Sequence, residues 1–205
     1  LSTLKSLLKR KDISGMNVTI PYKKKVMPFL DEIDPVAKAI GAVNTIVFKY
    51  NKRLGYNTDH IGFQKTLLNN LKSHHDKALV LGTGGASKAV CYVLEKLKIK
   101  VLKVSRSQGE DRKAYYQLTA EDYKKHTLLI NCTPLGTHPN TNTYPQINFE
   151  QINNSHFLYD LVYNPEITTF MKMGKTKGAE VLNGYQMLVE QAKASWSLWM
   201  DKHKK

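Results

Sequence analysis

Apolar and polar positions along the first part of the chain indicate short strands separated by turns. Residues 17–20 and 42–50 are rich in β-branched and aromatic side chains, and residues 54–57 return as a partner strand after a turn at 51–53. Leu4, Leu7 and Leu8 share one face of a helix that is predicted over residues 1–10. Further helices are predicted over residues 23–30, just after Pro21, and over residues 59–71.

From residue 77 onward the pattern alternates between strand and helix. The predicted strands cover residues 77–81, 100–104, 127–132, 157–161 and 179–182. The predicted helices cover residues 85–97, 121–125 and 167–175. Such a series of βαβ units predicts a parallel sheet that helices cover on both faces.

The last element is a strongly amphipathic helix over residues 185–200. Its apolar residues fall at helical spacing on one face: Tyr185, Leu188, Val189, Ala192, Trp196, Trp199 and Met200. We expect this stripe to pack into the core rather than to form a groove for a partner.

The composition is that of an ordinary globular protein. Of the 205 residues 41% are hydrophobic and 23% are charged, which suits one large domain or two small ones. No apolar run approaches the ~20 residues of a membrane helix, and the first residues lack the apolar block of a signal peptide. Cys91 and Cys132 lie in apolar stretches outside any CxxC pair, which predicts reduced, buried thiols in a cytoplasmic protein.

The net charge of +14 suggests an anionic partner. The lysines are spread along the chain, and the runs at residues 23–25 and 202–205 are short. No alternation of aromatic and basic residues and no recognition motif is present, so we expect no nucleic-acid partner. A dinucleotide phosphate and a carboxylate substrate are also anions, and a positive field attracts them.

A glycine-rich loop lies between the strand at residues 77–81 and the following helix. Residues 79–87 read LVLGTGGAS. Gly82 permits a tight turn, Gly84 lets the backbone approach a pyrophosphate, and Ser87 is small enough for close packing of helix on strand. The helix N-terminus offers free N–H groups and partial positive charge to phosphates. In this position the loop predicts a dinucleotide site.

The end of the next strand indicates which dinucleotide binds. A site for NAD usually has Asp or Glu about 20 residues past the first glycine, where it holds the ribose hydroxyl. Here the strand ends in Ser105, Arg106 and Ser107, without an acid. Arg106 and the two hydroxyls can instead bind a 2′-phosphate, which favours NADP.

Oxidation of an alcohol by a nicotinamide requires a group that takes the hydroxyl proton while hydride leaves the carbon. A lysine beside a carboxylate can do this without a metal. The seven histidines show no HExxH or HxxxH spacing and no GxSxG motif is present, so we expect neither a metal site nor a serine hydrolase. From spacing alone, Lys23 and Asp59 would be ordinary surface charges.

A series of motifs gives these residues a context. Residues 15–23 read GMNVTIPYK, residues 41–45 GAVNT, residues 55–59 GYNTD and residues 82–87 GTGGAS. They are followed by NCTPLG at 131–136, YDLVYNP at 159–165, and NG at 183–184 with MLVEQA at 187–192. In this order and over essentially its whole length, the chain resembles the shikimate dehydrogenase family.

The resemblance implies an NADP-dependent enzyme that interconverts shikimate and 3-dehydroshikimate, as a monomer or homodimer. It implies that Lys23 and Asp59 are the catalytic pair. It also implies sets of residues that hold the substrate hydroxyls and the cofactor. The substrate set is Thr19, Asn44, Tyr163 and Gln191; the cofactor set is Gly82, Thr83, Gly84, Gly85, Ala86, Ser87, Ser105, Arg106, Ser107, Asn131, Thr133, Pro134 and Gly184.

The implied architecture has two α/β domains with a cleft between them. Residues 1–59 would begin the substrate domain, residues 60–182 would form a Rossmann-like NADP-binding domain, and residues 183–205 would return as a helix to the substrate domain. Family members begin with a strand, a helix and a second strand, and their first turn carries a Ser-x-Ser motif for the substrate carboxylate. The present chain begins roughly 40 residues later by that comparison, so we expect weak substrate binding, exposed sheet edges and exposed apolar surface.

A second departure concerns the cofactor. The family often has a basic residue four positions after the one that matches Arg106, where this chain has Glu110; Arg112 or Lys113 could take that role. Three alternatives remain open: a relative that acts on quinate or a similar acid with NAD, a non-catalytic dinucleotide-binding protein, and a basic nucleic-acid-binding module.

Overall fold

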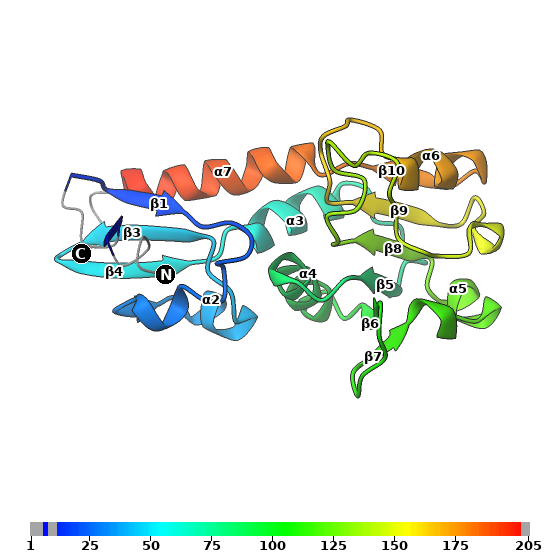
Figure 1. The fold of residues 1–205 in the computed structure, drawn as a ribbon, viewed down its shortest axis with the longest axis horizontal. Helices are drawn as coiled ribbons and strands as arrows, with labels where there is room; N and C mark the ends of the chain where they lie inside the picture. Colours follow the sequence, from blue (N-terminus) through cyan, green and yellow to red (C-terminus); the bar gives the residue numbers. More distant parts are fainter. Residues whose placement is uncertain (1–5, 8–11, 202–205) are drawn as a thin grey trace.

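The computed structural model describes residues 6, 7 and 12–201 of the chain. Ser6 and Leu7 are helical, and the rest of the helix predicted over residues 1–10 lies outside the described residues, as does the basic tail 202–205. Figure 1 shows two sheets beside one another. Two helices, α3 (Asp59–Leu68) and α7 (Tyr185–Met200), lie across the region between them.

The smaller sheet has four strands in the order β1-β3-β4-β2. The strands are β1 (Gly15–Asn17), β2 (Glu32–Ile33), β3 (Thr45–Lys49) and β4 (Lys52–Tyr56). β3 pairs antiparallel with both β1 and β4, and β2 pairs parallel with β4. Tyr50 and Asn51 close the β3–β4 hairpin with φ angles of 53° and 58°, and positive φ at both turn residues matches the right-handed twist of the strands.

The sequence pattern did not predict β2 or the six-residue helix α2 (Pro35–Ile40), because periodicity needs a longer window to stand out. The Asp34 carboxylate accepts hydrogen bonds from the backbone N–H groups at the start of α2, and Gly41 ends the helix with a φ of 70°.

The prediction of a helix over residues 23–30 is wrong. Those residues form turns and a short 3₁₀ helix η1 (Met27–Phe29), since Pro28 has no N–H to donate to a helical ladder.

The larger sheet has six strands in the order β10-β9-β8-β5-β6-β7, and all its pairs are parallel. The strands are β5 (Lys77–Leu81), β6 (Lys100–Ser105), β7 (Arg112–Ala114), β8 (Leu128–Asn131), β9 (Phe157–Asp160) and β10 (Glu180–Leu182). The predicted parallel sheet is thus confirmed, with β7 as an added edge strand. The strand order reverses between β5 and β8, and ligands of such sheets bind outside the carboxyl ends of the strands at this point.

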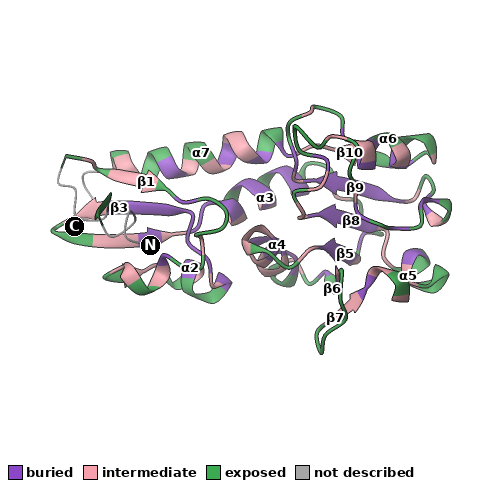
Figure 2. Cartoon of the chain, in the orientation of Figure 1, coloured by how far each residue is buried: buried purple, intermediate pink, exposed green. Residues whose placement is uncertain are grey.

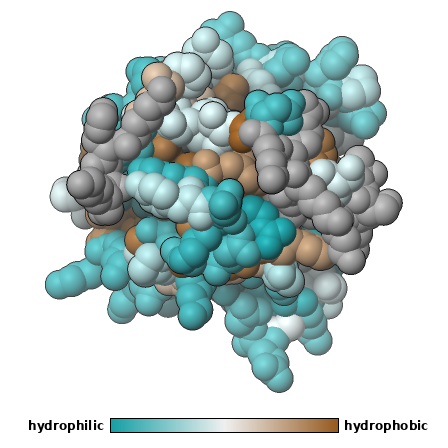
Figure 3. All heavy atoms as spheres, turned by 90° about the vertical axis from the view of Figure 1, so that its left-hand side faces the viewer, coloured by the Kyte–Doolittle hydropathy of each residue, from teal (hydrophilic) through white to brown (hydrophobic). Residues whose placement is uncertain are grey.

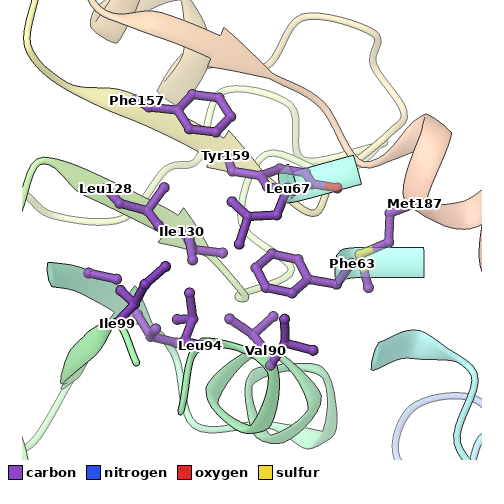
Figure 4. Close-up of a cluster of buried hydrophobic side chains, with 13 residues drawn as sticks. Phe63, Leu67, Val90, Leu94, Ile99, Leu128, Ile130, Phe157, Tyr159 and Met187 are labelled. Carbon is purple, nitrogen blue, oxygen red and sulfur yellow. The ribbon is translucent and has the colours of Figure 1, made fainter. Parts of the chain in front are cut away.

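Two apolar cores lie on the two faces of the larger sheet. One packs α3 and α4 (Gly85–Lys96) onto the sheet, with Phe63, Leu67, Val90 and Leu94 facing the strands (Figure 4). The other packs the remaining short elements onto the opposite face, as predicted for a sheet covered on both sides. These elements are η2 (Tyr115–Gln117), α5 (Ala120–Lys125), η3 (Phe149–Gln151) and α6 (Thr169–Thr176).

The apolar stripe of α7 faces the core only in part: Leu188, Val189 and Trp199 are partly buried, and for its other residues the prediction is wrong. Tyr185, Trp196 and Met200 are 58%, 61% and 53% exposed, whereas Glu190 and Ser195 are buried. In Figure 2 green exposed segments recur along α7, while β3, β8 and β9 are mainly purple. The face of α7 that carries Met187 and Gln191 packs on α3. Gly62 permits this close approach, since an added Cβ would be 2.5 Å from the Met187 carbonyl oxygen.

Apolar surface is also present at the end of the molecule that carries the small sheet, where Figure 3 shows brown residues among teal ones. β1 and β2 are the edge strands of this sheet. Cys91 and Cys132 are free and only partly buried. Among the described helices, none is long and apolar enough to cross a bilayer.

Candidate active site

The centre of the site is an ion pair between two residues that lie far apart in the sequence. Lys23 comes from the turn that follows β1, and Asp59 is the first residue of α3. Lys23 Nζ lies 2.7 Å from Asp59 Oδ2, and the two side chains are 16% and 8% exposed. The pair is therefore largely shielded from solvent, while Lys23 lines the cavity described below. Two residues that sequence spacing marks as surface charges form one polar unit.

Asn44 fixes the other oxygen of the carboxylate. Its Nδ2 donates to Asp59 Oδ1 at 2.9 Å, and its Oδ1 accepts from the Thr58 backbone N–H at 2.7 Å. A backbone N–H can only donate, so it determines which end of the amide is the oxygen and turns the Nδ2 end toward Asp59. Asn44 is 2% exposed, and Asp59 thereby accepts hydrogen bonds at both oxygens.

Gln191 joins this cluster from the other end of the chain. Its Oε1 lies 3.3 Å from Asn44 Nδ2 and 3.4 Å from Thr58 Oγ1, and its Nε2 donates to the Leu188 carbonyl. The close packing of α3 on α7 at Gly62 makes this approach possible, since a Cβ there would lie 3.1 Å from Gln191 Cβ. The structure thus brings Lys23, Asn44, Asp59 and Gln191 together.

The glycine loop and the lysine share a cavity of about 530 Å³. Gly82 has a φ of 102°, and Gly84 has nothing within 4 Å of the place where a Cβ would stand, so the backbone is open to a ligand. The cavity lies at the carboxyl ends of β5, β6 and β8, at the switch point of the sheet. Its walls are Ile20, Pro21, Lys23, Lys24, Gly82, Thr83, Gly84, Gly85, Ala86, Ser105, Arg106, Tyr115, Cys132, Thr133, Pro134 and Leu135.

Arg106 supplies positive charge at the wall of this cavity. It is exposed and follows β6 directly. Its charge acts on the neighbouring Tyr115, where it lowers the phenol pKa and so opposes the effect of burial. Burial raises the pKa of the Tyr115 phenol to about 12, so this wall of the cavity is a neutral ring. Nothing in the sequence singled out Tyr115, because it follows an edge strand that was not predicted.

The two candidates for a second phosphate-binding cation are in different environments. Lys113 Nζ is held by both oxygens of Asp122, at 3.0 and 2.9 Å, on α5. Arg112 donates to the Ser107 carbonyl and pairs with Asp111. Arg112 also lines a neighbouring cavity of about 450 Å³, which Thr83 of the glycine loop lines as well. Of the two candidates, Arg112 is thus the one that shares a cavity with this loop.

Several predicted site residues lie outside the larger cavity. The Ser87 hydroxyl donates back to the Gly84 carbonyl at 2.7 Å, and Ser107 meets Arg112 through its carbonyl. Gly184 packs so closely that an added Cβ would be 2.1 Å from the Leu161 oxygen. Thr19 and Tyr163 are exposed, and within the described chain neither side chain has a hydrogen bond to the Lys23–Asp59 cluster.

Asn131 supports the β8 turn from behind. Its Oδ1 accepts from the N–H and the hydroxyl of Thr133, and its Nδ2 donates to Asp160 Oδ1 at 2.9 Å. Asp160 also accepts from the Thr168 hydroxyl and the Val162 N–H. Burial raises the pKa of Asp160 to about 6 against the effect of these bonds. An acid at the end of the apolar strand FLYD is the signal that could have indicated this network.

Metal ligands do not gather in the described part of the chain. No group of three or more His, Cys, Asp or Glu side chains there could hold an ion. The charged side chains among the described residues that line the cavity are the amines of Lys23 and Lys24 and the guanidinium of Arg106.

The comparisons point to one family. Residues 1–46 match the family description "Shikimate dehydrogenase substrate binding domain". The NADP(+) shikimate dehydrogenase of Clostridium beijerinckii is 43% identical over 98% of this chain and 77% of its own length. That of Methanococcus maripaludis is 40% identical over 97% of this chain and 76% of its own length. The solved shikimate 5-dehydrogenase of Thermus thermophilus, in complex with NADP(H) and shikimate, is 30% identical with a TM-score of 0.84, over 97% of this chain and 77% of that one.

Proposed function

Because this chain belongs to the shikimate dehydrogenase family, we propose that it interconverts shikimate and 3-dehydroshikimate with NADP as hydride carrier. The relatives are named for NADP and for shikimate, which favours this reaction over quinate oxidation with NAD and over a non-catalytic remnant. The observation that carries the proposal is the 2.7 Å contact of Lys23 Nζ with Asp59 Oδ2 at the wall of the glycine-loop cavity.

The residues of the cavity fit a dinucleotide phosphate. The open backbone at Gly84, the positive φ of Gly82 and the start of α4 form a cradle that a side chain would fill. Arg106 lines the cavity next to Ser105. Its planar guanidinium could donate hydrogen bonds to a 2′-phosphate on the adenosine ribose. When bound, NADP⁺ would supply the acceptor for the hydride that leaves the substrate carbon.

The proton is handled by the chain's own residues. In the oxidation of shikimate the Lys23 amine takes the hydroxyl proton, and in the reduction of 3-dehydroshikimate the Lys23 ammonium returns it to the oxygen. The Asp59 carboxylate accepts from Lys23 through Oδ2, holding the nitrogen in place and stabilising its positive charge. Asn44 occupies Oδ1 and keeps the carboxylate from rotating.

The substrate hydroxyls would be held around this pair. Asn44 donates to Asp59, and Gln191 lies in hydrogen-bond reach of Asn44, so both amides are near the ion pair. Thr19 and Tyr163 are exposed side chains in loops and would contribute hydroxyls when substrate is present. The remaining cofactor residues would act indirectly, by supporting the loops that form the cofactor site; they are Ser87, Ser107, Asn131 and Gly184.

The proposed domain division follows the two sheets. Residues 1–59 contain the strands of the smaller sheet and residues 60–182 those of the larger one. Residues 183–205 contain α7, whose Trp199 Nε1 donates to the Ile46 carbonyl of β3 at 3.0 Å. This bond and the contacts of Gln191 support the assignment of α7 to the substrate domain.

The proposal is tested by shikimate-dependent reduction of NADP⁺ on this chain, followed by absorbance. We expect reduced cofactor to accumulate with shikimate and NADP⁺, and more slowly with NAD⁺ or with quinate in place of shikimate. Tight binding of NADP without reduction at high shikimate concentration would show that the chain holds the cofactor without this chemistry. Equal rates with quinate and NAD⁺ would favour the alternative reaction.

A further inference from the structure

A fully buried cluster of hydroxyls lies next to Asn44. Its members are Thr45, Thr58 and Ser195, each 0% exposed. Ser195 Oγ lies 2.8 Å from Thr45 Oγ1 and 3.0 Å from Thr58 Oγ1. None of the three is among the residues that wall the 530 Å³ cavity in the described chain. Because all three side chains are fully buried, the cluster is out of contact with any ligand and acts through its neighbours.

The single proton of Ser195 determines the direction of these bonds. The Gln191 carbonyl, one helical turn earlier, accepts it at 3.1 Å. The two lone pairs of Ser195 are then left to accept from two of three groups within reach: the Thr45 hydroxyl, the Thr58 hydroxyl and Asn17 Nδ2 at 3.2 Å. Ser195 is thus an acceptor that fixes where the protons of Thr45 and Thr58 can point.

Both threonines in turn surround the amide of Asn44. Thr45 Oγ1 and Thr58 Oγ1 lie 3.1 and 3.2 Å from Asn44 Oδ1, and Thr58 Oγ1 lies 2.9 Å from Asn44 Nδ2. The same Nδ2 donates to Asp59 Oδ1. A buried hydroxyl that loses its partner must turn to another, and the nearest alternatives here are the two ends of this amide.

We propose that Ser195 is a positioning residue for the reaction: it holds the Thr45 and Thr58 hydroxyls so that the Asn44 amide stays aligned with Asp59. The inference deepens the proposed function and rests on it for its effect on turnover. The alignment itself is a property of the folded chain and is measurable without substrate.

A purely structural role predicts a different result. Ser195 also ties α7 to the small sheet, so its loss could lower stability without disturbing Asn44. In that case the unfolding midpoint of Ser195→Ala would fall while the Asn44 amide and turnover well below that midpoint would not change. Ser197→Ala is the matched control, because the Ser197 hydroxyl makes the same bond to the carbonyl one turn earlier, at 3.0 Å to Lys193, on the exposed side of α7.

The experiment combines NMR and kinetics on the full chain. We expect solvent exchange of the Asn44 side-chain amide protons to be about 10-fold or more faster in Ser195→Ala, and unchanged in Ser197→Ala. We expect kcat with shikimate and NADP⁺ to fall roughly 3- to 10-fold with an unchanged KM for NADP⁺. In an Asn44→Ala background the same serine change should have no further effect on kcat, since its route of action is gone.

Unchanged exchange of the Asn44 amide in Ser195→Ala overturns the inference, and so does an undiminished kcat effect in the Asn44→Ala background. Faster exchange in a chain whose parent shows no turnover would overturn the proposed function but leave the alignment role of Ser195 intact. If Ser195→Ala does not fold, Thr45→Val removes the same hydroxyl contact with little change of shape. Thr45→Ser then restores the hydroxyl, and slow exchange should return with it.

Discussion

Lys23 and Asp59 meet at 2.7 Å although 36 positions separate them in the sequence. The turn after β1 carries the amine and the first turn of α3 carries the carboxylate, so each comes from a different element. Both side chains are largely buried, and in such a setting removal of one charge leaves its partner unpaired. The pair is therefore the first place where substitution should separate chemistry from cofactor binding.

Replacing Lys23 by alanine should lower kcat by ~10²–10⁴, because the group that exchanges the hydroxyl proton is lost. The affinity for NADP, measured by fluorescence titration, should stay nearly the same, since the glycine loop is untouched. Lys25→Ala is the control, as Lys25 is exposed and does not line the cavity. Turnover that survives in Lys23→Ala would contradict the assigned role.

Replacing Arg106 by alanine should weaken NADP binding and leave NAD binding almost unchanged. The guanidinium is exposed at the cavity wall, where a 2′-phosphate is the feature that only NADP carries. Dissociation constants for both cofactors measure the effect. Lys100→Ala removes the same charge at the other end of β6 and should change neither constant. An equal loss for both cofactors would place the 2′-phosphate elsewhere.

Asp160 predicts a dependence of stability on pH. Burial raises its pKa to about 6, so the folded chain binds this proton more tightly than the unfolded chain does. The stability that it contributes is therefore fully present below the unfolded pKa and is lost as the pH rises through about 6. Asp160→Asn keeps an oxygen for Asn131 and Val162 and removes the titration.

The stability of Asp160→Asn relative to the parent chain should thus rise between pH 4 and pH 8. At about 1.4 kcal/mol for each pKa unit, the change is at most about 3 kcal/mol. Urea unfolding at several pH values measures it, and Asp76→Asn, the same change on an exposed loop, is the control. A stability difference that is flat across this range would show that the carboxyl titrates normally.

The two tryptophans of α7 should respond differently to substitution. Trp196 is 61% exposed, so Trp196→Ser should change the free energy of unfolding by less than about 1 kcal/mol. Trp199 donates to the Ile46 carbonyl and packs where a Cβ on Gly15 would be 2.3 Å from its Nε1, so Trp199→Ser should cost about 2–4 kcal/mol. Equal costs in urea unfolding would contradict the observed orientation of the helix.

Elements with strong local signals were predictable. The strand at residues 77–81 and the helix at residues 185–200 have the predicted bounds, because a buried parallel strand is a continuous apolar run and a long helix repeats its pattern several times. The short elements β2, α2 and β7 were missed, since two to six residues contain too few repeats to stand out.

The orientation of α7 shows a limit of periodicity. The apolar stripe would be the natural buried face, yet the helix leaves Trp196 and Met200 exposed and buries Glu190 and Ser195 along with Met187. Glu190 is held by Lys65 and Lys193, and Ser195 by the threonine hydroxyls. Such pairing offsets the cost of burying polar groups, and the partners come from other elements, so the sequence of the helix alone does not reveal them.

The sequence by itself determined the family, the parallel sheet and the glycine loop. These depend on motifs and on hydrophobic patterns within short segments, which can be read without knowing which distant residues pack against them. Only the tertiary structure decided that Asn44 donates to Asp59 and meets Gln191, that Ser195 lies against Thr45 and Thr58, and that Arg112 rather than Lys113 shares a cavity with Thr83. Hydrogen bonds act over about 3 Å, and the residues that come within that distance depend on how helices and sheets pack rather than on their order in the chain.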